Sequence, residues 1–189
     1  MAASGDPRAA RTRGRLRQAL LAACEEQPLE DVSVLEVVRR AGVGRATFYL
    51  HYEDLHGLAV DACAELVRTA VDALHAWEAL PDPASPPSAL NELLESARER
   101  AALYRSLLRP GGGGPLGELL HRELMERSLA ERGRRLPGGN ADEVAASAVA
   151  AAFTGVLADW LHERIPGSPA ELSGRVWRLL GAIHAAFRP

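Results

Sequence analysis

The hydrophobic pattern of this chain has the spacing of amphipathic helices along most of its length. Apolar residues recur three and four positions apart in the segments 12–26, 54–74, 116–135 and 141–164, the spacing that places them on one face of a helix. No segment alternates apolar and polar residues as a half-buried strand does. The pattern therefore predicts an all-α protein.

The segment Ser33–Tyr52 has the pattern of two short helices joined by a glycine turn. Ser33 is suited to cap a helix, and Glu36, three residues later, is placed to complete a capping box by bonding the N–H of the cap. Gly42 ends this first helix because glycine readily adopts the left-handed conformation. The apolar stripe of the first helix comprises Val34, Val37, Val38 and Ala41.

The second helix is expected over Arg45–Tyr52, with Phe48 and Tyr52 on its inward side. Its other side has the composition of a surface that enters a DNA groove. It offers an arginine fork for a guanine edge, small or apolar groups for thymine methyls, and hydroxyl and imidazole donors for phosphates. These residues are Arg45, Ala46, Thr47, Tyr49, Leu50 and His51. A helix-turn-helix is therefore predicted.

The same stretch resembles the DNA-binding signature of the TetR family of bacterial transcription regulators. The similarity extends from about Arg11 to Leu66, and its most specific parts are Ala41-Gly42-Val43 and Thr47-Phe48-Tyr49. The resemblance implies an all-α fold of about nine helices. Leu55, followed by His56, departs from the family pattern, because most members have a lysine there.

The resemblance also implies roles for individual residues. The positions that match Thr47, Tyr49 and His51 hold phosphates in the family, and those that match Arg45 and Ala46 face bases. We include Ser33 among the expected DNA contacts. The basic N-terminus adds Arg11 and Arg13, which are expected to reach phosphates or the minor groove; a solvated arm is the alternative.

Three helices with one apolar stripe each can bury those stripes only against one another. They predict a three-helix head, and the long stripe from Asp54 to Leu74 predicts a connector helix that leads from it to a second body. We accordingly expect a disordered basic arm (residues 1–10), a helix-turn-helix domain (11–56) and a helical effector-binding and dimerisation domain (57–189). The glycines at 111–114 are interpreted as a flexible linker.

The last two helices carry more apolar surface than one buried face requires. Either the final helix is the core of the body, or it meets a second copy of itself in a two-fold interface. The resemblance implies a homodimer through these helices, and the expected interface comprises Thr154, Ala158, Trp177, Leu180 and His184. The middle helices could enclose a cavity for a hydrophobic small molecule, lined by Tyr104, Leu108, His121, Met125 and Phe153, although ordinary core is the favoured explanation for each one taken alone.

Composition argues against catalysis and against the membrane. The 189 residues have a net charge of −3, with 47% hydrophobic residues, and lack metal-ligand spacings, nucleophile elbows and phosphate loops. We expect no enzyme, no cofactor and no metal. Cys24 and Cys63 suit packing in a reducing compartment. No stretch approaches the roughly 20 apolar residues of a membrane span, which predicts a cytoplasmic protein.

These features predict a dimeric, sequence-specific regulator that binds double-stranded DNA at a roughly palindromic operator. A repressor released by a hydrophobic small-molecule effector is the favoured form. The alternative is a TetR-like co-regulator whose C-terminal body binds a partner protein.

Overall fold

The computed structural model describes residues 7–75, 82, 84–135 and 143–186, apart from the side chains of residues 132–135 and 184. In this part of the chain there are nine α-helices and two short 3-10 turns, and no strand. The predicted all-α fold is confirmed. Contacts divide the chain into two compact units, Met1–Cys63 and Ala64–Pro189, and α4 (Leu55–His75) contributes residues to both.

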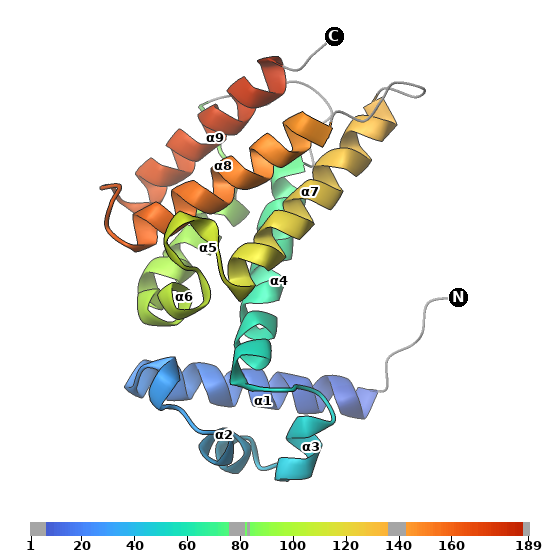
Figure 1. The fold of residues 1–189 in the computed structure, drawn as a ribbon, viewed down its shortest axis with the longest axis vertical. Helices are drawn as coiled ribbons and strands as arrows, with labels where there is room; N and C mark the ends of the chain where they lie inside the picture. Colours follow the sequence, from blue (N-terminus) through green and yellow to red (C-terminus); the bar gives the residue numbers. More distant parts are fainter. Residues whose placement is uncertain (1–6, 76–81, 83, 136–142, 187–189) are drawn as a thin grey trace. The chain divides into compact units, whose positions relative to one another are not determined.

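The N-terminal unit is built from three helices and the start of α4. It contains α1 (Pro7–Glu26), the 3-10 turn η1 (Leu29–Asp31), α2 (Val34–Ala41) and α3 (Arg45–Tyr49). Within this unit α2 packs against α1 and α3 packs against α2, as the blue end of Figure 1 shows. The fully buried side chains at the centre of the unit are Leu16, Leu20, Val37, Phe48 and Leu58.

Helix α1 begins at Pro7, earlier than the expected start near residue 12. Proline is favoured at the first position of a helix because its fixed φ suits the helix and its missing N–H has no partner there. Residues 7–10 are therefore helical, and the expected disordered arm is wrong for them. Residues 1–6 of that arm lie outside the described part of the chain.

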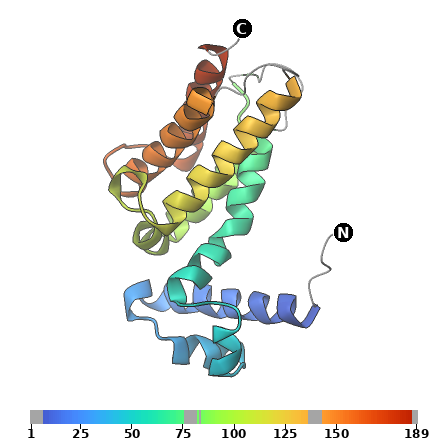
Figure 2. The ribbon, with the colours of Figure 1, turned by 45° about the vertical axis from the view of Figure 1, so that its right-hand side comes forward.

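The C-terminal unit is arranged around α8 (Glu143–Leu161), which packs against α7 (Pro115–Arg135) and α9 (Pro169–Ala186). Figure 2 shows these helices in orange, yellow and red. Two further helices, α5 (Ser88–Glu99) and α6 (Ala101–Leu107), and the 3-10 turn η2 (Pro110–Gly112) complete the unit. Neighbours on more than one side explain why α8 buries small residues such as Thr154 and Ala158 as well as large ones such as Phe153 and Trp160.

The glycine run is a compact turn, and its interpretation as a flexible linker is wrong. A Cβ atom added at Gly112 would lie 3.0 Å from Thr154 Cγ2, and one added at Gly117 would lie 1.9 Å from the Gly112 carbonyl oxygen. Gly111, Gly112 and Gly114 all have positive φ. Glycine is required here because the turn packs directly against α8 and the first turn of α7.

One described helix is long and apolar enough to cross a bilayer by length and composition alone. Helix α8 has a mean hydropathy of 1.6 over its most apolar window, and 56% of that window is buried inside the protein. The expectation that no stretch would approach such a composition therefore needs this exception. Burial of its side chains among α7, α9 and η2 accounts for the apolar sequence, as in the core helix of a soluble domain.

Candidate nucleic-acid interface

Helix α2 begins at the expected cap. The Ser33 hydroxyl accepts a hydrogen bond from the Glu36 backbone N–H at 3.2 Å, and Ser33 itself has extended backbone angles. This bond satisfies one of the N–H groups that have no partner in the first turn of a helix. The sequence signature therefore places the start of α2 correctly.

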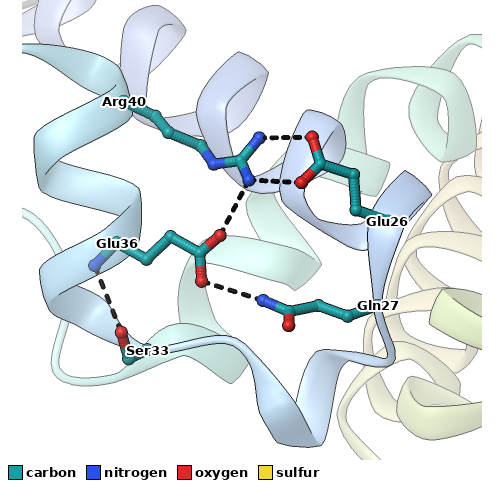
Figure 3. Close-up of polar contacts among 5 residues, drawn as sticks. All are labelled: Glu26, Gln27, Ser33, Glu36 and Arg40. Carbon is teal, nitrogen blue, oxygen red and sulfur yellow. Dashed lines mark hydrogen bonds and ion pairs between the residues drawn. The ribbon is translucent and has the colours of Figure 1, made fainter.

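The second half of the predicted capping box is replaced by contacts between helices (Figure 3). The Glu36 carboxylate accepts hydrogen bonds from Gln27 Nε2 and Arg40 Nη2, both at 2.8 Å. Arg40 also forms a bidentate ion pair with Glu26, and these hydrogen bonds lower the pKa of Glu26. The Glu36 carboxylate, which was expected to bond the Ser33 N–H, instead ties α2 to the end of α1. Arg40 is paired with the carboxylates of Glu26 and Glu36.

The turn between the two helices is fixed by its glycine and by an arginine from α1. Gly42 has φ 60° and ψ 42°, the left-handed conformation predicted for it. Arg15 Nη2 donates to the Gly42 carbonyl oxygen at 3.1 Å. A cation at the end of α2 is favourable because the helix dipole is negative there. The turn that leads into α3 is thus held by the body of α1.

Helix α3 is anchored by one fully buried side chain, Phe48. Its ring packs edge-on against Tyr49, with ring centroids 5.2 Å apart. On the other side Arg45 and Ala46 are exposed, as are 49% of Tyr49 and 81% of Leu50, while Thr47 and His51 are half-buried. The structure brings these six predicted DNA-contacting residues together on one short segment.

Arg45 is held over the ring of Tyr49. Its guanidinium carbon lies 5.7 Å from the ring centroid, and its Nη2 donates to the Tyr49 hydroxyl at 3.4 Å. A cation over an aromatic ring at this distance is attracted to the face of the ring. The contact limits the directions that the guanidinium group can take.

The helical part of this segment is shorter than expected, because α3 ends at Tyr49 instead of Tyr52. Leu50 and His51 form a turn, and the N–H groups of His51 and Tyr52 both donate to the Phe48 carbonyl oxygen. Such tightened last turns are common where a helix ends.

Four further residues of the N-terminal unit are exposed and bear on DNA binding. Arg11 and Arg13 lie on exposed positions of α1 instead of on an arm. Leu35, at 68% exposure, and Arg39 project from α2 and were missed as candidates. Arg39 has no ion pair within the described residues, whereas Arg40 has two. The unequal partners of two adjacent arginines cannot be derived from helix spacing alone.

Solved structures match this chain over nearly its whole length. A TetR transcriptional regulator from Rhodococcus sp. RHA1 superposes with a TM-score of 0.62 at 19% identity, covering 95% of this chain and 98% of that chain. The TetR-family repressor AlkX from Dietzia sp. strain DQ12-45-1b, implicated in biodegradation of n-alkanes, superposes with a TM-score of 0.61 at 18% identity, covering 96% and 97%. The fatty acid degradation regulator FadR from Bacillus halodurans gives 0.52 at 17% identity, covering 89% and 97%.

The chain has the fold of the TetR-family regulators. The predicted fold is therefore confirmed on an independent ground, and the helix-turn-helix occupies α2 and α3 of the TetR fold. No protein-family model matches the sequence, and no curated protein matches it.

In the body of this TetR fold the residues predicted to line an effector cavity do not share one environment. Tyr104, Leu108 and Phe153 are fully buried, Met125 is half-buried and His121 is exposed. His121 instead borders an open surface hollow between η2, α7 and α8, beside Glu118, Arg122 and Thr154. The lining of a common cavity by these five residues stays a prediction.

The residues predicted to form a dimer interface are buried within the single chain. Thr154, Ala158, Trp177 and Leu180 lie in the core of the C-terminal unit, and Trp177 Nε1 donates to the Asp82 carbonyl oxygen at 2.7 Å. The side chain of His184 lies outside the described residues. The large apolar side chains exposed in the described part of this unit are Val144 on α8 and Leu179 on α9, at 68% and 40%.

Proposed function

We propose that this protein is a TetR-family transcriptional regulator that binds double-stranded DNA in the cytoplasm. One observation carries the proposal. The outward side of the segment Arg45–His51 presents an arginine, apolar groups and hydroxyls on a short helix anchored by Phe48. No carboxylate lies in that segment to repel a phosphate. A side chain set of this kind suits the major groove, where donors and thymine methyls distinguish base pairs.

Within this proposal the exposed residues have separate roles. Arg45 reads a guanine edge, and Ala46 and Leu50 contact thymine methyls. Phosphates are held by Ser33, Thr47, Tyr49 and His51, with Arg11 and Arg13 of α1 as additional basic contacts. The Ser33 hydroxyl is suited to both tasks, because it accepts the cap bond through a lone pair and still has its own hydrogen to donate.

The proposed regulator is a homodimer that pairs through α8 and α9. Support comes from Val144 and Leu179, whose exposed apolar side chains lie on these helices, because exposed apolar surface commonly marks an interface. A two-fold dimer places two recognition helices in successive major grooves, about 34 to 36 Å apart, and so requires a roughly palindromic operator.

We further propose a repressor that is released by a hydrophobic small molecule. The effector is proposed to be apolar because a cavity among the middle helices α5 to α7 would be lined mainly by leucine, the residue that these helices bury most. AlkX is implicated in biodegradation of n-alkanes and FadR regulates fatty acid degradation, so n-alkanes and fatty acids are the first compounds to test.

The test is selection of duplexes from a randomised DNA pool by the purified full-length protein. We expect enrichment of a near-palindrome whose half-sites are centred about 10 to 10.5 base pairs apart. Arg45→Ala should enrich a more variable sequence, whereas Arg109→Ala, which removes an exposed arginine of the C-terminal unit, should enrich the same one. If the wild type enriches no sequence, the proposal fails and a co-regulator that binds a partner protein becomes the better explanation.

A further inference from the structure

Tyr52 follows the segment Arg45–His51, here called the recognition segment, and links it to α4. Its ring packs on Phe48 with centroids 5.9 Å apart. Its hydroxyl donates to Asp61 Oδ2 at 2.5 Å. Asp61 lies in the second turn of α4, and both residues belong to the N-terminal unit. A residue that the sequence pattern indicates only as apolar packing therefore makes a directed polar bond to another helix.

The same carboxylate also faces α1. Arg17 Nη1 lies 3.9 Å from Asp61 Oδ2, and the two side chains are each about one third exposed. Asp61, a residue of α4, thus faces both α1 and the end of the recognition segment. Within one compact unit, a single carboxylate of α4 therefore contacts both α1 and the residue that follows the recognition segment.

Helix α3 needs such a connection because it is short. It has five residues and buries only Phe48, and one aromatic ring holds the position of a helix better than its rotation. Hydrogen bonds to base edges depend on direction as well as distance. The Arg15 bond to Gly42 restrains the turn before α3, and the Tyr52 bond restrains the turn after it.

We propose that Tyr52 and Asp61 form a positioning pair that sets the orientation of the recognition helix and so the preference of the protein for its operator. The inference rests on the DNA-binding function proposed above and adds two residues that do not themselves touch DNA. The pair acts through Arg45 and its neighbours by holding the C-terminal end of α3 in place.

The hydroxyl is suited to this role under ordinary conditions. Burial, together with the hydrogen bond to Asp61, raises the pKa of Tyr52, so that the hydroxyl keeps its proton and remains a donor. Phenylalanine at this position would preserve the ring contact with Phe48 and remove only the bond. The substitution Tyr52→Phe therefore separates positioning from packing.

The experiment measures the affinity of full-length variants for the selected duplex and for a scrambled duplex, by fluorescence anisotropy. Tyr52→Phe and Asp61→Ala should each lower the ratio of the two affinities about 3- to 10-fold, the range expected for one net hydrogen bond. The double variant should lose no more than either single one, because both remove the same bond. Asp61→Asn, whose amide oxygen still accepts, should retain most of the preference.

Ser128→Ala is the matched control, since it removes a buried hydroxyl and its hydrogen bond to His75 from the C-terminal unit. It should leave the ratio unchanged even if it lowers the thermal midpoint. The inference is overturned if Tyr52→Phe lowers the midpoint but keeps the wild-type ratio, because the pair would then only stabilise the fold. If the wild type itself prefers neither duplex, the proposed function fails and the inference fails with it; loss of preference in Arg45→Ala but not in Tyr52→Phe refutes the inference alone.

Discussion

The two compact units hold their predicted functional residues in opposite environments. In the N-terminal unit, Arg45, Ala46, Tyr49 and Leu50 are exposed around one buried phenylalanine. In the C-terminal unit most of the residues predicted for a cavity or an interface are buried in the core, including Phe153 and Trp177. Predictions from the same kind of sequence pattern therefore picked out exposed residues in the N-terminal unit and mostly buried residues in the C-terminal unit.

The difference follows from the residue types on which each prediction was based. Arginine, tyrosine and histidine close together on a short helix have little reason to be buried unless they are paired, so such a group indicates a surface. Leucine and aromatic residues at helical spacing are needed for any core, so a cavity or an interface made of them has no separate signal. Function is easier to locate where it uses residues that packing does not require.

Truncation of Phe153 should have the largest effect on stability and gives the clearest test of the contrast between the two units. Phe153→Ala removes a buried ring and is expected to lower the free energy of unfolding by about 3–5 kcal/mol. Leu50→Ala, an equally predicted residue that is exposed, should change it by no more than about 0.5 kcal/mol. Urea denaturation of both variants measures the two values. Equal losses would contradict the contrast between a buried and an exposed set.

Replacement of Arg45 should affect DNA binding and leave stability alone. Arg45→Ala is expected to reduce affinity for the selected duplex by about 1–3 kcal/mol and to relax base preference. Its thermal midpoint should match that of the wild type, because the side chain contacts only the exposed ring of Tyr49. Anisotropy titrations and thermal melts on one preparation provide both readings, and an unchanged operator preference would show that α3 is not the recognition surface.

Each unit has a helix that begins with a serine cap, Ser33 at α2 and Ser168 at α9. Ser33→Ala and Ser168→Ala should each lower the free energy of unfolding by about 1 kcal/mol, the usual loss for a cap. Only Ser33→Ala should also weaken DNA binding, because Ser33 is one of the proposed phosphate contacts. A loss of DNA affinity in Ser168→Ala, or none in Ser33→Ala, would argue against that assignment.

Acid should destabilise the C-terminal unit through His75, the smallest effect considered. His75 Nδ1 donates to the Val71 carbonyl and Nε2 accepts from Ser128. Burial is the main cause that lowers the pKa of His75, and the nearby charge of Arg127 also lowers it. The charges of Glu131 and Asp72 act in the opposite direction. The folded protein then binds this proton less readily than the unfolded chain. The contribution of His75 is complete above its ordinary pKa of 6.5 and is lost as the pH falls below it.

Denaturation between about pH 7.5 and 5.5 checks this dependence. The free energy of unfolding should fall more steeply with acid in the wild type than in His75→Gln. Parallel slopes would show that His75 titrates alike in the folded and unfolded states.

The two Ser-x-x-Glu signatures also show how far sequence reasoning reaches. At α9 the box is complete, since Glu171 accepts from the Ser168 N–H at 2.8 Å and Ser168 caps the Glu171 N–H; the Ser168 bonds lower the pKa of Glu171. At α2 the glutamate is taken by Gln27 and Arg40. Local spacing predicts where a helix begins, but competing partners elsewhere in the fold decide which group the glutamate side chain bonds.

The same limit applies to the site as a whole. The helix-turn-helix, its glycine turn and the outward side of α3 follow from periodicity and turn chemistry. The pairing of Arg40 with Glu26 and the bond from Tyr52 to Asp61 join residues whose meeting depends on tertiary packing. Those contacts could not be predicted because no local pattern encodes which partner lies nearest.

The most direct test of the account is an anisotropy titration of the purified wild-type protein with the selected duplex and a scrambled duplex at two salt concentrations. We predict tight binding that prefers the selected duplex, and a steep loss of affinity at the higher salt as counterions compete for the phosphates. Equal and weak binding to both duplexes would contradict the assignment of α3 as a reader of DNA sequence.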